Sequence, residues 1–182
     1  MQNSIKIWAV IYPLIFFSLL ISGCNKSVIP DAENHNYSKA EVAKYTMIPG
    51  KGFGPIHFSQ PGLVVEEVFG PPEETLVKGS REYLSLGITF LADKEDNVGT
   101  IIFGNVSGSS EDPIVKSCIF KTDRGIKIGS TREEIIAAYG EPKNPRKMAG
   151  KEMMVYHEIG GIFTLNENSL IHMLFSMPSA EN

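Results

Sequence analysis

Two stretches of the chain, 54–72 and 124–142, repeat one pattern of apolar and polar positions. In each stretch, three apolar residues spaced i, i+3 and i+4 line one side of a predicted helix: Val65, Val68 and Phe69 in the first, and Ile135, Ala138 and Tyr139 in the second. Gly70 and Gly140 end these helices, each with proline close behind. Helices this short need packing against a neighbouring element to be stable.

The two predicted helices begin differently. Ser130 and Glu133 have the S-x-x-E spacing of a capping box, so the second helix is expected to begin after Ser130. Glu133 and Glu134 also place negative charge near the positive end of the helix dipole. In the first stretch, Pro61 suits the first helical position, where its missing N–H costs nothing.

Strand-like stretches follow each helix. They cover 82–86, 88–92 and 98–103 after the first helix, and 151–157, 162–165 and 170–175 after the second. Polar turns at 93–97 and 166–168 separate the last two strands of each set. A further strand, 114–121, is predicted around Cys118, which we interpret as a small buried hydrophobe.

Alternation with a period of two gives such a sheet two faces. The face predicted to lie under the helices carries Ile101, Phe103, Ile171, Met173 and Phe175. The opposite face is predicted to carry Thr100 and His172 among Val98, Ile102, Leu170 and Leu174. This second face is semi-apolar, whereas an uncovered sheet face is usually polar. It is therefore a candidate surface for a partner.

These elements predict an α+β fold with two tandem repeats, each a short helix packed on an antiparallel β-meander. Repeat 1 is expected over 45–105, a linker over 106–113 and repeat 2 over 114–178. Each repeat has only about 60 residues, too few to bury a sizeable core alone, so we expect the repeats to pack closely. The pattern leaves open whether they share one sheet.

The first 44 residues have a different character. Residues 1–23 read as an export signal, with Lys6 as the only charge and an apolar run at 7–20 that is too short for a convincing membrane span. Residues 24–44 are polar and are expected to form a flexible tether.

The tetrapeptide Ile21-Ser22-Gly23-Cys24 resembles a bacterial lipobox. The resemblance implies cleavage before Cys24, acylation of its thiol and of the new amine (palmitate in many lipoproteins), and a membrane anchor. A plain secretory signal with an incidental cysteine is the alternative. By resemblance to enterobacterial lipoproteins, Asn25 in place of aspartate favours the outer over the inner membrane.

The run G-S-T-x-x-E-I-x-x-x-Y-G-E-P resembles the SmpA/BamE-like lipoproteins and also β-lactamase inhibitory protein, which has two tandem helix–sheet units. The matching positions are Gly129, Ser130, Glu134, Ile135, Gly140 and Pro142, with Gly70 and Pro72 upstream. The resemblance implies a helix packed on one face of an antiparallel sheet. A BamE-type protein has one such unit, whereas this chain is predicted to have two.

Composition and motifs narrow the chemistry. The chain has 182 residues and a net charge of −4, with no basic stripe for nucleic acid. No nucleophile elbow, P-loop or zinc-protease motif occurs, so no catalytic residue and no cofactor is predicted. His35, His57, His157 and His172 lack the spacing of a zinc pair, and the acidic turn at 93–97 lacks the order of a calcium loop. No metal site is therefore predicted.

The first helix has Leu63 and Val64 where the second has Glu133 and Glu134, so an apolar corner there should be covered. The cover is expected from residues 45–48, from the other repeat or from a partner protein.

The sequence thus predicts a lipid-anchored cell-envelope protein that binds another envelope protein or supports envelope assembly without catalysis. It is expected to attach to the membrane through Cys24 and to its partner through Thr100, Tyr156, His172, Leu63 and Val64. One alternative is an inhibitor-like module that captures an exported enzyme on the open sheet face. The other is an enzyme or small-ligand receptor, which requires a deep pocket with convergent polar groups.

Overall fold

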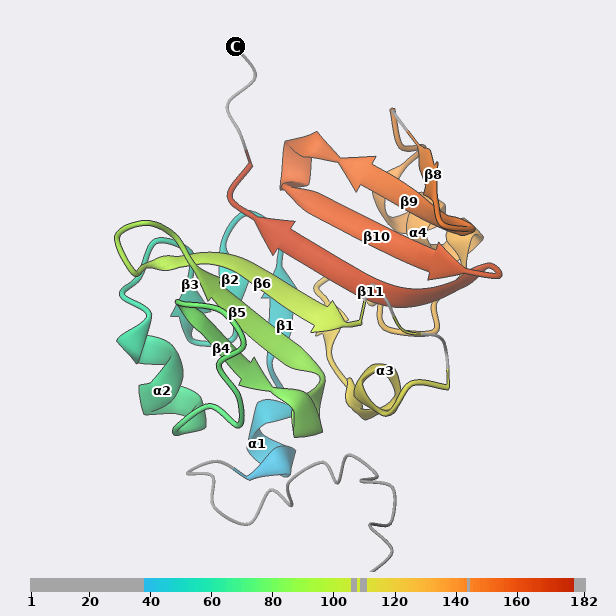
Figure 1. The fold of residues 1–182 in the computed structure, drawn as a ribbon. Coiled ribbons are helices and arrows are strands. Elements are labelled where there is room, and N and C mark those ends of the chain that lie inside the picture. Colours follow the sequence, from blue (N-terminus) through green and yellow to red (C-terminus); the bar gives the residue numbers. More distant parts are fainter. Residues whose placement is uncertain (1–37, 106–107, 109–110, 144, 179–182) are drawn as a thin grey trace, which may run out of the picture.

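The structure is a computed structural model, which describes residues 38–105, 108, 111–143 and 145–178 (Figure 1). The protein has an α+β fold with short helices and antiparallel-rich sheets, so the expected fold class is confirmed. The α-helices in these ranges are α1 (Lys39–Val42), α2 (Leu63–Phe69), α3 (Pro113–Ser117) and α4 (Arg132–Tyr139). Within the described residues, none of the helices has both the length and the apolarity needed to cross a membrane.

A seven-stranded antiparallel sheet forms the centre of the molecule. Its order is β4-β5-β6-β11-β10-β9-β8. The strands are β4 (Ser80–Tyr83), β5 (Ile88–Ala92), β6 (Val98–Gly104), β8 (Arg146–Met148), β9 (Lys151–Tyr156), β10 (Gly161–Asn166) and β11 (Ser169–Ser176). Because β6 pairs with β11, the two predicted meanders lie in one sheet. The rings of Phe103 and Phe175 pack across this seam at 6.4 Å.

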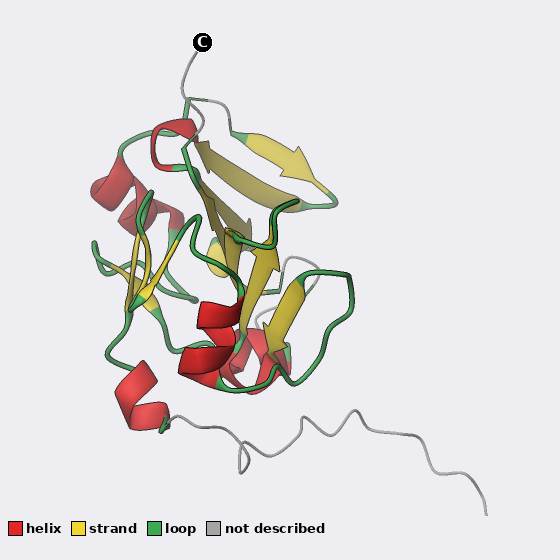
Figure 2. Cartoon of the chain, turned by 90° about the vertical axis from the view of Figure 1, so that its left-hand side faces the viewer, coloured by secondary structure: helices red, strands yellow, loops and turns green. Residues whose placement is uncertain are grey.

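A small second sheet packs behind the large one. It has the order β3-β2-β1-β7, with β1 (Thr46–Ile48), β2 (Gly52–Phe53), β3 (Ile56–His57) and β7 (Lys121–Thr122). Figure 2 shows it as a separate layer. Phe53 lies at the centre of the core between the sheets, with the rings of Phe120 at 4.8 Å, Phe103 at 5.2 Å and Phe69 at 6.4 Å.

The first half of the chain (45–105) and the second half (114–178) share several local contacts. The Tyr83 hydroxyl donates a hydrogen bond to the carbonyl oxygen of Gly70 at 2.8 Å, and the Tyr156 hydroxyl donates to that of Gly140 at 2.8 Å. In both halves this tyrosine ends a strand and precedes a single 3₁₀ turn: η1 (Leu84–Leu86) or η2 (His157–Ile159). A left-handed glycine then leads into the next strand. Each tyrosine thus ties a strand of the large sheet to the end of a helix.

The predicted tether ends earlier than expected. Residues 39–42 form α1, which a capping box between Ser38 and Glu41 begins. Val42 is buried, and the ring of Tyr45 packs on Phe53 at 5.8 Å. The flexible segment predicted over 24–44 is therefore wrong for 38–44, because these residues bury apolar side chains in the core. Residues 1–37, including the predicted signal and Cys24, lie outside the described ranges.

Both helix starts differ from the prediction. Thr131, not Ser130, is the N-cap of α4, and it forms the capping box with Glu134. The two adjacent pairs have the same spacing, but Ser130 is buried and its hydroxyl accepts a hydrogen bond from the Lys127 N–H. In the first half α2 begins at Leu63, because Pro61 is engaged in a bridge with Asn97.

The strand predicted over 114–121 is also wrong, since 113–117 form α3. Asp112 caps this helix by accepting a hydrogen bond from the Ile114 N–H at 2.8 Å, and Pro113 occupies the first turn. The Asp-Pro pair in the sequence was the available signal. Cys118 follows the helix and is buried, as predicted. Likewise, residues 84–86 form a 3₁₀ turn rather than the end of a strand.

Two β-bulges correct the predicted faces of the sheet. In β5–β6, Leu91 pairs with Thr100 and Ala92 with Val98, so the strand partner skips Gly99. In β10–β11, Thr164 pairs with His172 and Leu165 with Leu170. Each extra residue reverses the alternation beyond it. Val98 and Leu170 therefore lie in the core and not on the opposite face, and Ile171, the extra residue of β11, is buried outside the main core cluster.

Candidate functional site: the open side of the large sheet

The helices and the small sheet lie on one side of the large sheet. Arg81 of β4 forms an ion pair with Glu66 of α2 at 2.9 Å, and Glu152 of β9 forms one with Arg132 of α4 at 3.0 Å. The paired register puts both strand residues on the core side. We call the opposite face, toward the viewer in Figure 1, the open side. It is the candidate site.

The first-half end of the open side is covered by the connection from α2 to β4. Glu82 points to this side and is 7% exposed, because its carboxylate accepts hydrogen bonds from the Leu76 N–H at 3.2 Å and the Ser80 hydroxyl at 3.0 Å. The Val77 N–H donates to the Ser80 hydroxyl oxygen. The connection is thus fixed over Ser80 and Glu82, the two residues of β4 that face the open side.

Over the middle of the open side, no such cover is formed by the residues that the structure describes. The half-buried side chains there form what we call the open patch: Thr89, Leu91, Thr100, Ile102, Met153, Val155, Ile162 and Leu174. Leu91 and Thr100 face each other across β5 and β6, and Ile162 lies between Val155 and Leu174. Apolar side chains therefore outnumber polar ones in the patch.

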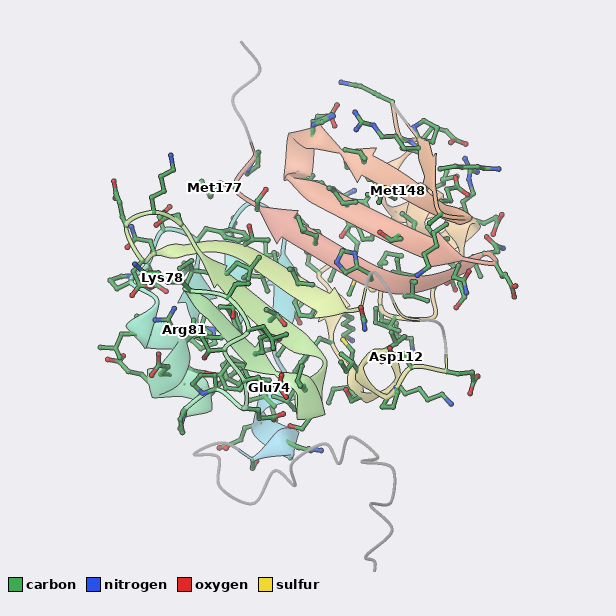
Figure 3. All side chains as sticks on the ribbon, viewed as in Figure 1. Glu74, Lys78, Arg81, Asp112, Met148 and Met177 are labelled. Carbon is green, nitrogen blue, oxygen red and sulfur yellow. The ribbon has the colours of Figure 1, made fainter. Side chains whose placement is uncertain are left out.

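An open hollow of about 170 Å³ lies at one end of the patch, where Val155, Ile162, Leu174 and Met177 line it together with Ser176. Its volume is close to that of an engineered protein cavity of ~150 Å³ that accepts benzene. The hollow therefore has room for one large apolar side chain. Met177 and Met148 stand at the rim of the open side (Figure 3), and they are 52% and 60% exposed.

Charge on the open side is unlike that of the whole protein. The strand register places Arg146 of β8 and Lys151 of β9 on this side. At the strand positions of β5, β6 and β8 to β11 no carboxylate faces it, because Glu152, the one acidic residue in these strands, points to α4. The Lys151 ammonium also donates to the carbonyl oxygen of Gly108 at 2.8 Å. In a chain of net charge −4, the second-half end of the open side thus carries two cations, whereas Glu82 lies at the covered first-half end.

Two of the predicted partner residues, Thr100 and His172, face the open side, as expected. Thr100 is half-buried in the patch, whereas His172 is 5% exposed and its Nδ1 lies 3.3 Å from the Thr164 hydroxyl. Burial, with a smaller contribution from the nearby Lys151 charge, lowers the pKa of His172 to about 4. His172 is therefore neutral near pH 7 and lies beneath the surface.

Leu63 and Val64 do not join this site, whereas Tyr156 is among the residues that line the hollow. Tyr156 points to the helix side, where its hydroxyl is bound to Gly140 and burial raises its pKa to about 12. The alternation in β9 thus places its side chain on the opposite face from Thr100, and its part in binding a partner stays a prediction. Leu63 is 58% exposed on α2, and Val64 packs partly against the core.

The residues that the sequence analysis missed are those of the second-half end: Val155, Ile162, Met177, Arg146 and Lys151. The alternation of Lys151, Met153 and Val155 could have indicated a shared face. Only the register of β9, β10 and β11 shows that Val155 and Ile162 lie beside Leu174.

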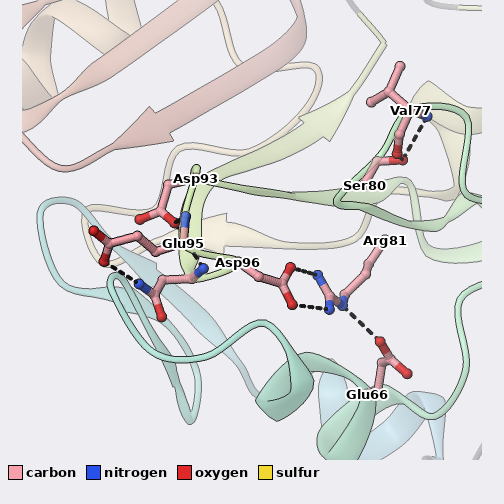
Figure 4. A network of polar contacts seen from close by, with 8 residues as sticks. Glu66, Val77, Ser80, Arg81, Asp93, Glu95 and Asp96 are labelled. Carbon is pink, nitrogen blue, oxygen red and sulfur yellow. Dashed lines mark hydrogen bonds and ion pairs between the residues drawn. The ribbon is translucent and has the colours of Figure 1, made fainter.

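The acidic turn at 93–97 is engaged by internal contacts (Figure 4). The Asp93 carboxylate accepts hydrogen bonds from the N–H groups of Asn97 and Glu95, which lower its pKa, and Asp96 pairs with Arg81. Within the described ranges no three metal-ligating side chains come together. At Cys118, burial raises the thiol pKa to about 11, which disfavours the reactive thiolate.

Two further hollows lie beside α4. A groove of about 500 Å³ is lined by Lys127, Glu134 and Ala137, and a smaller one of about 250 Å³ is lined by Tyr139, Glu141 and Glu158, with Arg124 lining both. The Arg124 guanidinium lies 5.0 Å from the centre of the Tyr139 ring and donates to the carbonyl oxygen of Ala138. Arg124 is thereby used to hold the end of the helix.

No protein-family model matches the chain, and no curated protein matches it. Among solved structures, the chain is similar to a DUF4309 family protein (YjgB) from Bacillus subtilis. The two share 14% sequence identity with a TM-score of 0.43, over 63% of this chain and 76% of that one. A similarity of this size carries no information about activity.

Proposed function

We propose that this protein is a lipid-anchored cell-envelope protein, non-catalytic, that binds another envelope protein through its open side. The observation that carries the proposal is the open patch: a semi-apolar sheet surface with a hollow, uncovered by the described chain and lined by cations in an acidic protein. Uncovered apolar surface of this kind is typical of interaction sites.

The anchor is a part of the proposal that rests on sequence. Diacylation of Cys24 would place residues 25–37 between the lipid and α1, a span of at most about 45 Å when extended. Such a reach lets the open side meet a partner in or near the same membrane. Cys24→Ala should abolish incorporation of labelled palmitate, and unchanged labelling would refute the anchor. Separation of the two membranes by density would then test the expected outer-membrane location.

We also infer that the two halves are copies of one helix-on-meander module. The supports are the two tyrosine bonds to a helix-ending glycine and the two left-handed glycines, Gly87 and Gly160, that follow the 3₁₀ turns. If the copies use their tyrosines alike, Tyr83→Phe and Tyr156→Phe should each lower the free energy of unfolding by about 1 kcal/mol. Urea unfolding measures both, and a cost confined to one would contradict the equivalence.

Crosslinking in cells tests the partner. A photo-reactive amino acid at Ile162, in the hollow, should yield a discrete adduct with an envelope protein. The same group at Leu63, which is more exposed than Ile162 but lies on α2, is the control and should not give that adduct. An assembly-machinery component as partner would support the assembly role. An exported enzyme that loses activity when bound would support the inhibitor alternative. No adduct from Ile162 would count against both.

A further inference from the structure

We infer that the open patch binds an extended acidic segment of the partner protein, which places one apolar side chain in the hollow and a carboxylate next to Lys151 and Arg146. This inference rests on the proposed function and adds the chemistry of the partner.

The charge distribution supports an acidic segment. In the sheet order β5-β6-β11-β10-β9-β8, the strand residues that face the open side include two cations, Arg146 and Lys151, and no carboxylate. His172 adds no charge there near pH 7, since it is buried and neutral. At the second-half end of the patch an acidic segment would be attracted by Arg146 and Lys151, whereas a basic one would be repelled by them.

The geometry fixes a spacing within that segment. Val155 in the hollow and Lys151 lie on the same strand and the same face, four positions apart. At about 3.3 Å per residue this separation is about 13 Å. A segment lying extended along β9 would therefore carry its carboxylate four positions from its apolar residue, so that both side chains point toward the sheet.

A second copy of this chain and a lipid surface fit less well. The acidic turn of a second copy is committed internally, because Asp93 is bound to its own backbone turn and Asp96 to Arg81. A lipid surface is fluid and lacks a fixed side chain to fill a recess of about 170 Å³. A protein segment can supply both the side chain and the carboxylate.

The test uses fluorescent peptides and the full-length lipidated protein in nanodiscs. The probe is a short threonine–serine peptide with one phenylalanine and, four positions later, one aspartate. Comparison peptides replace the aspartate by lysine, replace the phenylalanine by serine, or reduce the separation to three. Fluorescence anisotropy should show at least about tenfold tighter binding of the probe than of each comparison peptide, with weakening as salt rises.

Two variants in β8 test whether the peptide's aspartate is attracted by the positive charge on the open side. Arg146→Glu should weaken the probe about tenfold and strengthen the lysine peptide, because it replaces one of the two positive charges by a negative one. Lys147→Glu is the matched control. Lys147 is also exposed in β8, but it lies opposite Glu152 in the strand register and so faces the helix side. This variant should leave the probe's affinity unchanged. Circular dichroism verifies that both variants fold.

The possible outcomes separate this inference from the proposed function. Equal binding of the aspartate and lysine peptides, or equal loss in the two variants, would overturn the acidic-segment inference even if Ile162 crosslinks to an envelope protein. Specific probe binding without any such adduct would support the patch chemistry while the proposed envelope partner fails. Concentration-dependent dimers that compete with the probe, or binding of the unacylated Cys24→Ala chain to anionic vesicles in place of the probe, would also overturn it.

Discussion

The open side of the first half is covered by the connection that follows the helix, whereas that of the second half is not covered by the described residues of the corresponding connection. In the first half, the connection after α2 bonds to Glu82 and Ser80 and closes over the sheet. In the second half, the corresponding connection after α4 forms β8 and lengthens the sheet instead. Two stretches in equivalent places thus cover one end of the surface and extend the other.

This difference teaches that the connections, more than the strands, decide where a partner can bind. The strands supply apolar side chains to the open side in both halves, as Leu91 and Ile162 show. In the second half these side chains line a hollow that no described segment covers. The following predictions test this contrast, from the largest expected effect to the smallest.

The largest contrast is expected at the last residue of each helix. Phe69 is fully buried among aromatic rings, including those of Tyr83 at 5.2 Å and Phe90 at 5.6 Å, whereas Tyr139 is half-buried. Phe69→Ala should lower the free energy of unfolding by about 3–5 kcal/mol, and Tyr139→Ala by about 2 kcal/mol. Urea unfolding measures both. Equal losses would show that the halves are packed alike.

The next effect is the dependence of the free energy of unfolding on pH, which arises from the buried His172 of the second half. The folded protein holds the pKa of His172 at about 4, below its ordinary 6.5, so the unfolded chain binds more protons between these values. Stability from this group is complete above about pH 6.5 and is lost as pH falls toward 4, by about 3 kcal/mol at most.

Unfolding midpoints in urea across this pH range measure the loss. His172→Gln should flatten this part of the profile, and His57→Gln, at an exposed position, should leave it unchanged. A profile that keeps its slope in the His172 variant would place the titrating group elsewhere.

A change at Glu82, the buried acidic residue of the first half, should have a smaller effect on stability. Glu82→Gln exchanges a charged acceptor for a neutral amide beneath the connection, at a cost of about 1–2 kcal/mol. Hydrogen exchange at the Leu76 N–H should accelerate, because this group loses its strongest acceptor. Glu67→Gln, an exposed change on α2, is the control. Unchanged exchange at Leu76 would mean that Glu82 does not hold the cover in place.

The smallest effect distinguishes the helix starts. Thr131→Ala should cost about 1 kcal/mol through loss of the cap on α4, and Thr131→Ser should restore most of it. Ser130→Ala should cost less, since its hydroxyl accepts a bond from the Lys127 N–H and does not cap the helix. Thermal unfolding ranks the three variants, and a larger loss at Ser130 would return the cap to that residue.

The sequence predicted much of the fold because its local signals agree. Helical spacing located α2 and α4, terminal glycines ended them, and alternation with turns located the strands of both meanders. It failed where two local signals competed. Ser130 and Thr131 both have a glutamate three positions on, and the choice between them depends on the tertiary burial of Ser130.

The candidate site was harder to predict than the fold, for two physical reasons. A bulge adds one residue, so the side chains on its two sides no longer follow one alternation. No pattern of alternation alone could therefore have placed Val98 and Leu170, which precede the extra residues, in the core. The hollow also needs three strands in register, which brings Val155 next to Ile162 and Leu174. Thr100 and His172 were placed on the correct side because they follow the extra residues of the bulges and alternate regularly with Ile101 and Met173.

The position of β1 has a mechanical consequence. This strand is hydrogen-bonded to β2 of its own half and, in parallel, to β7 of the other half. A pull on the chain ahead of α1 would load β1 along its length and shear both pairings together. Resistance to such tension would then be governed by the rate at which this doubly held strand slides free, and both halves of the molecule would share the load.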